Sequence, residues 1–342
     1  MLSTRPAYGY GAAVAEIAYD VVGIGNAIVD VISQEGDAFI DTYGLTKGAM
    51  VLIDAERAVE LYAAMDVMAE TSGGSACNTM IGVASFGGSA SIIGKVADDD
   101  LGQVFGNDAR SSGVELAVPP GGDGEPTGRS MVIVTPDAER TMNTFLGAAT
   151  TLYRSDIPED LVASSQYLYC EGYIWDIDVT KDAIRHAIAI AQANGRKVSF
   201  TLSDSFCVNR HLDEWHQLLD NDIDLLFGNE DELMALTSAP TFTEAVEAVR
   251  GRCDILCATR GAAGSLIVTA DETVEIAAVP VDNVVDTTGA GDQYAAGVLY
   301  GLTHGMSLHD AGMLGSKAAA EVISHVGARP ERPLSDFLNS AG

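Results

Sequence analysis

The stretch DTTGAGD, residues 286–292, has the residue types and spacing that most directly suggest chemistry. The small-residue run 293–302 predicts a helix, and residues 281–285 read as the end of a strand. The glycines then fall at a strand-to-helix turn, where free backbone amides and the positive end of the helix dipole attract an anion. We therefore predict an anion site at this turn.

The individual residues of this turn suit phosphoryl transfer. Gly289, Ala290 and Gly291 carry too little bulk to keep a phosphoryl group from the backbone amides. Asp292 places a carboxylate beside them, which could take a proton from a group that attacks phosphorus. A plain glycine-rich turn, with the aspartate acting only as a helix cap, is the alternative reading.

The longer stretch DTTGAGDQYAAG resembles the C-terminal signature of the ribokinase-like, or PfkB, family of carbohydrate and nucleoside kinases. The resemblance implies an α/β fold, a ribokinase-like three-layer α/β/α core with a mostly parallel sheet and a small β lid. It also implies that Asp292 is the general base for a substrate hydroxyl and that the amides of residues 289–292 stabilise the transferred phosphoryl group. ATP as co-substrate and Mg²⁺ belong to the same expectation.

Two further segments resemble the family's acceptor-binding parts. GIGNAIVD, residues 23–30, is not a dinucleotide turn because Ile28 stands where that motif needs glycine. Its N-x-x-x-D spacing resembles adenosine-kinase-like members, and GGSACNT, residues 73–79, resembles the family's first signature with Ser75 where ribokinases carry lysine. The implied acceptor-binding residues are Asn26, Asp30, Gly73, Gly74 and Asn78.

The resemblance assigns the nucleotide side to the second half of the chain. In GNEDEL, residues 228–233, Asn229 and Glu232 would serve Mg²⁺ and phosphate, through water because Mg²⁺ holds its hydration shell tightly. Standing alone, N-x-x-E indicates a helix start. In TRGAAGSLI, residues 259–267, Thr259, Gly261 and Gly264 would let the backbone approach ATP.

Three more residues are candidates near the transferred phosphate. Arg140, in a predicted hairpin, would neutralise the phosphate if it lies on a lid, whereas a surface arginine in a turn is the alternative. Asp286 and Thr288 would help to form a monovalent-cation site, for K⁺, next to the anion turn, as in many relatives.

The elements that must position these residues alternate between strands and helices, which predicts βαβ units and a mostly parallel sheet. We expect a loose tail over 1–17 and a kinase domain over 18–335, with a β lid formed from insertions around 34–53 and 115–147. Residues 128–146 read as a hairpin and 36–53 as extended chain. The other expected strands lie at 20–33, 90–94, 167–170, 197–202, 224–227 and 254–258, and the expected helices at 54–69, 76–86, 180–194 and 242–251.

Composition narrows the class of partner. With 19 Lys and Arg against 49 Asp and Glu, the net charge is −30, which argues against nucleic acid and anionic membranes as partners. Five scattered cysteines predict buried free thiols in a cytoplasmic protein, and no secretory signal or membrane span is recognisable. His211 and His216 read as surface residues rather than metal ligands.

These observations predict a kinase acting on the hydroxymethyl group of a nucleoside, with adenosine as the first candidate. A sugar kinase for ribose, fructose or a related furanose is the alternative, and a non-catalytic ligand-binding regulator is a third. Adenosine needs an apolar slot, for which Tyr173, Ile174 and Trp175 are candidates. The protein is expected to be a monomer or a homodimer.

Overall fold

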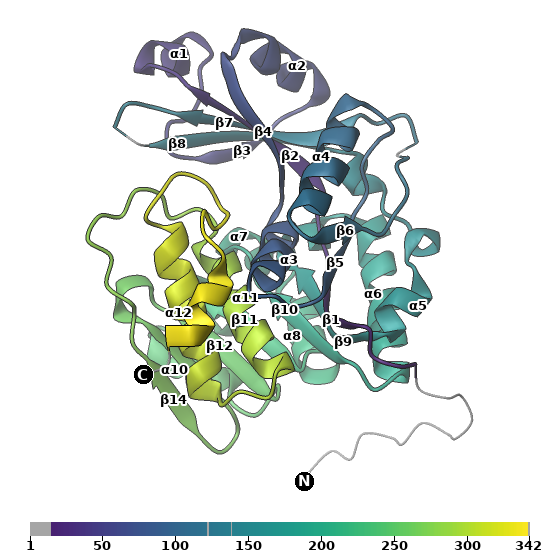
Figure 1. The fold of residues 1–342 in the computed structure, drawn as a ribbon, viewed down its shortest axis with the longest axis vertical. Helices are drawn as coiled ribbons and strands as arrows, with labels where there is room; N and C mark the ends of the chain where they lie inside the picture. The colour runs from purple at the N-terminus through teal and green to yellow at the C-terminus, as the bar shows by residue number, and fades with distance from the viewer. Residues whose placement is uncertain (1–14, 122, 138, 341–342) are drawn as a thin grey trace.

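A large sheet forms the centre of the protein in the computed structural model, which describes residues 15–121, 123–137 and 139–340 (Figure 1). Its nine strands lie in the order β14-β13-β12-β11-β10-β9-β1-β5-β6. All strands from β12 to β6 run parallel, and β13 and β14 extend one edge in antiparallel fashion. Their bounds are Tyr19–Ile24 (β1), Ala90–Ile93 (β5), Val114–Leu116 (β6), Ser165–Glu171 (β9), Lys197–Thr201 (β10), Leu225–Asn229 (β11), Ile255–Thr259 (β12), Ser265–Val268 (β13) and Thr273–Ile276 (β14).

Helices cover both faces of this sheet, so its strands are apolar on both sides. In β1, Val22 and Ile24 belong to one core cluster and Val21 to the other. The first cluster joins the sheet to α5 (Glu159–Ala163), α6 (Asp178–Ala193), α7 (Ser205–Arg210), α8 (Leu212–Asn221), α9 (Glu230–Thr237) and α10 (Phe242–Val249). The opposite layer holds α3 (Ser75–Ser85), α4 (Asp100–Ser111), α11 (Ala290–Thr303) and α12 (Leu308–Val322). The predicted three-layer α/β/α core with a mostly parallel sheet is thereby confirmed.

A second, five-stranded sheet in the order β3-β8-β7-β2-β4 lies over one end of the core in Figure 1. Its strands are Ile28–Gln34 (β2), Met50–Leu52 (β3), Val67–Gly73 (β4), Thr127–Val134 (β7) and Arg140–Gly147 (β8). The helices α1 (Asp37–Thr42) and α2 (Ala55–Ala64) pack on its outer face against Val29, Val31 and Met131. Because side chains alternate along a strand, Ile28 and Asp30 point to the inner face.

Short 3₁₀ helices complete the chain at Ala148–Thr151 (η1), Arg154–Asp156 (η2), Gly172–Asp176 (η3), Gly261–Ala263 (η4) and Leu334–Ser340 (η5). The five cysteines are free and buried, as predicted. No helix within the described ranges is both long and apolar enough to span a membrane. Most of the predicted tail, residues 1–14, lies outside the described residues.

Several expected elements are wrong in detail. The strand predicted over 20–33 is two strands in different sheets, because the chain leaves the large sheet at Gly25, where a Cβ would lie 2.5 Å from Glu171 Oε2. Residues 36–53 contain helix α1 as well as β3, and the helix predicted over 54–69 ends at Ala64, before β4. Residues 281–285 form no strand, since the backbone there bonds to the end of α12 through Val285 and Ile323.

The small sheet is also wider than the two insertions from which a lid was expected. Strand β4 and all of β2 except its last residue, Gln34, lie outside residues 34–53 and 115–147, yet the two strands form one side of this sheet. Both strands carry predicted acceptor-binding residues, so the small sheet contributes directly to the candidate site.

Candidate active site

The carboxyl ends of the parallel strands form the edge along which the predicted site residues gather. Strands β9, β10 and β11 end at Glu171, Thr201 and Asn229, and Asn26 follows β1 after one intervening residue. Ligands of open parallel sheets bind outside this edge. The candidate site therefore comprises the edge and the facing surface of the small sheet.

Glu171 is a central member of the site that the sequence did not reveal. Its Oε1 accepts the Asn26 amide at 2.8 Å and its Oε2 accepts the Ala76 amide at 2.7 Å, so one carboxylate joins the end of β1 to the start of α3. Burial raises the pKa of Glu171 to about 7, against the lowering effect of these two amides. Its position as the last residue of an apolar strand is the signal that could have identified it.

Gly73 on β4 is the register partner of Ile28 on β2, and the Asp30 side chain lies diagonally against it. A Cβ at Gly73 would lie 2.5 Å from Asp30 Cγ and 2.6 Å from each carboxylate oxygen, so only glycine leaves room for this carboxylate. Burial raises the pKa of Asp30 to about 6, while Arg140 and Arg329 act in the opposite direction. The structure thus places an enclosed carboxylate on the inner face of the small sheet.

The start of α3 holds the carboxylate of Asp292. Ser75 Oγ donates to Asp292 Oδ1 at 2.6 Å, and Asn78 Nδ2 approaches Oδ2 at 3.4 Å. Asn78 Oδ1 is buried and has no hydrogen-bond partner among the described residues. Gly74 has a φ of 93°, and a Cβ there would lie 2.1 Å from Asn26 O, which explains the second glycine.

Asp292 lies in the first turn of α11, directly beside the anion turn. Burial raises its pKa to about 6, opposed by the hydrogen bonds from Ser75 and Asn78 and reinforced by Asp30. Gly289, with φ of 77°, is the N-cap residue of this helix, and a Cβ at Gly291 would meet open space. In this first turn the Ala290 amide already donates to Thr287 O at 3.2 Å, which leaves the amides of Gly291 and Asp292 as the donors that an anion would meet.

Arg140 reaches from β8 to Asp286 and forms a short ion pair with its carboxylate. The same carboxylate accepts the amides of Thr288 at 3.0 Å and Gly327 at 2.8 Å. Although burial acts to raise it, the two amides and the guanidinium hold the pKa of Asp286 below its ordinary value. A monovalent cation here would have to share this carboxylate with a guanidinium group, so the arrangement does not favour the expected K⁺ site.

The residues predicted to bind the nucleotide lie at and just after the ends of two neighbouring strands, β11 and β12. Asn229 and Thr259 are direct partners across β11 and β12. Asn229 and Glu232 form a reciprocal helix cap, in which Asn229 Oδ1 accepts the Glu232 amide and the glutamate accepts the Asn229 amide, both at 2.9 Å. The helix-start reading of N-x-x-E therefore holds for the structure. Gly261, the first residue of η4, and Gly264, which directly follows this helix, have positive φ values of 53° and 84°.

The predicted apolar slot is wrong for two of its three residues. Ile174 and Trp175 are buried in the core cluster beneath the sheet. Tyr173 lies closer to the site, and its hydroxyl donates to Ser203 O at 3.1 Å. Burial raises the pKa of Tyr173, and nearby carboxylates, including those of Asp292 and Glu232, act in the same direction.

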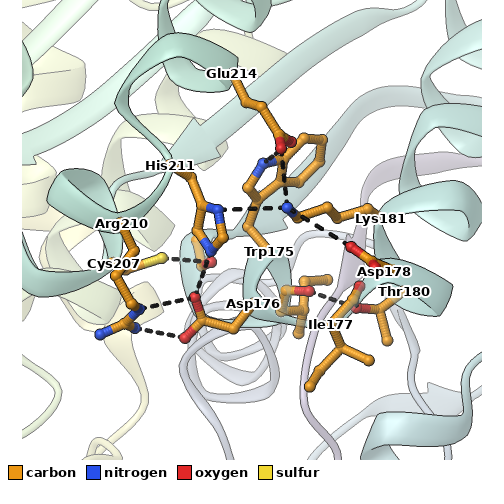
Figure 2. Close-up of polar contacts among 12 residues, drawn as sticks. Trp175, Asp176, Ile177, Asp178, Thr180, Lys181, Cys207, Arg210, His211 and Glu214 are labelled. Carbon is orange, nitrogen blue, oxygen red and sulfur yellow. Dashed lines mark hydrogen bonds and ion pairs between the residues drawn. The ribbon is translucent and has the colours of Figure 1, made fainter.

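A polar network fixes η3, the segment that carries Tyr173, to three helices (Figure 2). His211 Nε2 lies 2.7 Å from Asp176 Oδ1, and its Nδ1 lies 3.3 Å from Lys181 Nζ. Lys181 also contacts Glu214 at 3.0 Å, and Glu214 accepts the indole N–H of Trp175 at 2.8 Å. The expectation that His211 is a surface residue is therefore wrong, because it bridges α6 and η3.

Comparisons with known proteins agree with this geometry. The pfkB family carbohydrate kinase pattern matches residues 37–334. The 5-dehydro-2-deoxygluconokinase of Bacillus subtilis is 26% identical over 335 residues (94% of this chain and 95% of that protein), and the adenosine kinase of Schizophyllum commune is 28% identical over 350 residues (94% and 99%).

Two solved structures are more similar still. The adenosine kinase from Sinorhizobium meliloti is 47% identical with a TM-score of 0.87, and a probable sugar kinase from Rhizobium etli is 45% identical with a TM-score of 0.88. Each match covers 95% of this chain and 99% of the other. The chain therefore belongs to the pfkB family of carbohydrate kinases and is an ATP-dependent enzyme that transfers a phosphoryl group to a hydroxyl.

Proposed function

We propose that the enzyme phosphorylates the hydroxymethyl group of a nucleoside, with adenosine as its acceptor. The observation that carries this proposal is the place of Asp292, between the anion turn and the acceptor-side residues Ser75 and Asn78. A carboxylate in this position can reach both a phosphoryl group at the turn and a hydroxyl group beside α3.

Asp292 would act as the general base. With a pKa of about 6 it is largely ionised at neutral pH, yet basic enough to accept a proton as the acceptor oxygen attacks the γ-phosphate. Ser75 and Asn78 fix the direction of the carboxylate through its two oxygens. The free Asn78 Oδ1 is available to accept a hydrogen bond from an acceptor hydroxyl.

The charge of the transferred group would be stabilised from two sides. Residues 289–292 form the N-terminus of α11, where the positive end of the helix dipole and the free first-turn amides would meet the phosphate. Arg140 supplies a cation from the small sheet, and its buried Nε has no partner among the described residues. A guanidinium with a free donor next to the anion turn is suited to bind a phosphate oxygen.

Asn229 and Glu232 fit Mg²⁺ as partners of its bound water. Both carboxylate oxygens of Glu232 already accept hydrogen bonds from Asn229, which argues against direct coordination. Each oxygen keeps a second lone pair for water, and Asp204 adds negative charge nearby. When bound, the ion would neutralise charge on the phosphates of ATP.

The inner face of the small sheet supports a nucleoside rather than a free sugar. Asp30, Ser130 and Thr144 are direct partners on neighbouring strands, and Ser130 Oγ lies 2.9 Å from Thr144 Oγ1. Beyond Thr144 this face continues into a hollow of about 350 Å³. Its lining is Leu52, Ile53, Glu125, Thr144, Phe145, Leu146, Gly147 and Thr150.

This arrangement matches the two ends of a nucleoside. The ribose hydroxyls would bind to the carboxylate of Asp30, and the planar base would occupy the mostly apolar hollow two strands away. A larger hollow of about 790 Å³, beside η2 and the start of α6, contains none of the predicted site residues.

A sugar kinase is the second candidate. It is favoured by similarity to relatives described as 5-dehydro-2-deoxygluconokinase and probable sugar kinase. A free sugar has no base, so no part of it would fill the apolar hollow beyond Thr144.

The test is ADP release from MgATP with a panel of nucleosides and free furanoses, with Asp292→Asn as the inactive control. We expect the enzyme to turn over with adenosine. We also expect that Leu146→Asp, which puts a charge into the hollow, raises the KM for the nucleoside. Turnover with ribose or fructose and none with any nucleoside would overturn the nucleoside assignment in favour of the second candidate.

A further inference from the structure

Residues 327–329, which follow α12 and are called the crossing segment below, contact both the anion turn and the end of β4. The Gly327 amide donates to Asp286 Oδ2 at 2.8 Å, and Ala328 O accepts Gln293 Nε2 at 3.0 Å. Ala328 packs so closely on the anion turn that a Cβ at Gly289 would lie 2.6 Å from its Cα. The position of this segment is therefore fixed relative to the anion turn.

The next residue, Arg329, turns toward the acceptor side. Its guanidinium binds the Asp108 carboxylate of α4 and the Ser72 hydroxyl of β4 through short contacts. Asp108 Oδ2 also accepts the Ser72 amide at 2.8 Å and the Ser72 hydroxyl at 2.9 Å. Ser72 directly precedes Gly73, which packs against the Asp30 carboxylate. The contact between Arg329 and Ser72 therefore fixes the end of β4 next to Asp30.

A second link closes the arrangement through α11. Gln293 Nε2 donates both to Ala328 O and to Asn78 O, each at 3.0 Å. One amide group thus ties the crossing segment to α3, which carries the acceptor-side residues that hold Asp292. The crossing segment is therefore linked to the anion turn and to the acceptor-side elements α3 and β4. The distance between these parts decides whether a bound hydroxyl group can reach a bound phosphate.

We propose that Arg329 is a positioning residue for phosphoryl transfer, which sets the acceptor site at β4 against the anion turn at 289–292. The proposal rests on the proposed function of these two sites. Reactions of this type depend steeply on the alignment of attacking and transferred groups. Arg329 is suited to the task because its side chain is only 19% exposed and its planar guanidinium binds two partners at once.

Arg329 also has an electrostatic role toward Asp30. The charged groups that act on this carboxylate are Arg140 and Arg329, which favour its ionised form, and Asp292, which is repelled by it. Loss of the Arg329 charge should raise the pKa of Asp30. The acid limb of kcat/KM for the acceptor should then move to higher pH, a change that a residue serving stability alone would not produce.

The experiment compares Arg329→Gln with the wild type and with Arg332→Gln. Arg332 is an exposed arginine of the same segment whose guanidinium lies over the Phe337 ring, so it controls for the loss of one positive charge. We expect Arg329→Gln to lower kcat by about tenfold or more, with the KM for ATP little changed. Arg329→Lys, which keeps the charge, should restore the acid limb but not the full kcat.

Two further measurements keep the proposal testable. Asp108→Asn, on α4, weakens the same contact without altering the arginine, and it decides the question if Arg329→Gln does not fold. Hydrogen exchange of the amides of residues 72–74 needs no substrate, and it should be faster in Arg329→Gln than in Arg332→Gln.

The outcomes are distinct from those of the proposed function. If the wild type phosphorylates no nucleoside, the proposed function fails while faster exchange at 72–74 still shows that Arg329 fixes β4. Unchanged kcat, unchanged acid limb and unchanged exchange in the folded Arg329→Gln or Asp108→Asn variant would overturn the proposal. Effects of the two substitutions that add fully would also contradict it, because both act through one ion pair.

Discussion

Gly73→Ala provides a sharp test of the acceptor site, because the added methyl group would meet the carboxylate of Asp30. The ideal Cβ lies 2.5 Å from Asp30 Cγ, whereas ordinary contacts begin at 3.4 Å. Gly73 does not have a positive φ, so alanine adds no backbone strain. The carboxylate must then move by about 1 Å, which is enough to spoil the geometry of a hydrogen bond to the acceptor.

The expected effect follows from the value of such a bond. A hydrogen bond to a charged group contributes about 1.5–3 kcal/mol, which corresponds to a rise of about 10- to 150-fold in the acceptor KM. The KM for ATP should change by less than about twofold, because the residues proposed to bind ATP lie at β11 and β12 of the other sheet. The substitution should therefore raise the KM for the acceptor and leave the KM for ATP almost unchanged.

The assay is ADP release with the acceptor varied at saturating ATP and then the reverse. Gly106→Ala is the matched control, since it lies within α4, does not have a positive φ, and its Cβ would meet nothing within 4 Å. It should leave both KM values unchanged and stabilise the helix by about 0.5–1 kcal/mol. An acceptor KM for Gly73→Ala within about twofold of wild type would refute the assigned role of Asp30.

Two further predictions concern stability. The carboxyl groups whose pKa is raised in the folded protein are Asp30, Glu171, Glu232 and Asp292. Between about pH 5 and 7, above the range in which carboxyls of lowered pKa such as Asp286 titrate, the folded state therefore binds more protons than the unfolded state, so the free energy of unfolding should fall as pH rises. Calorimetry should give a higher Tm for the ligand-free protein at about pH 5.5 than at about pH 7.5, and the opposite order would contradict the assignment. Arg140→Met should lower the free energy of unfolding by about 3 kcal/mol, because it strands the Asp286 carboxylate, which is 5% exposed. In urea titrations, adding Asp286→Asn should recover part of that loss, and a fully additive loss would show that the two side chains act separately.

The parts of the fold and site that could be predicted are those that depend on the order and spacing of residues close together in the sequence. Apolar strands alternating with helices predict the three-layer core, and the glycines and carboxylate of residues 286–292 lie at a turn into a helix. Gly73 and Gly74 could be identified for a similar reason, since their lack of a side chain matches close contacts with Asp30 and Asn26.

The remaining features depend on contacts between distant parts of the chain. Glu171 bonds to residue 26, Arg140 to Asp286 and Arg329 to Ser72, at separations of 145 to 257 residues. No local spacing encodes such pairs. Ser75 illustrates the same limit, because the sequence marked it as a replaced lysine whereas the structure makes it a hydrogen-bond donor to the proposed base.

The break of the first strand at Gly25 also had no local signal. Residues 20–33 are mostly apolar, which is typical of a buried strand, yet the chain passes there from one sheet to another. The reason is tertiary, since the backbone at Gly25 lies against the Glu171 carboxylate and Ala76. The small sheet consequently received two strands that the pattern had assigned to the core or to a helix.

The central claim is that Asp292 removes the proton from the acceptor hydroxyl, and kcat of Asp292→Asn measures it most directly. Asparagine keeps the shape of the side chain and can still contact Ser75 and Asn78, so binding of both substrates should be retained. We predict that kcat falls by about 10²-fold or more. A variant that binds both substrates and turns over within a few-fold of wild type would contradict the account.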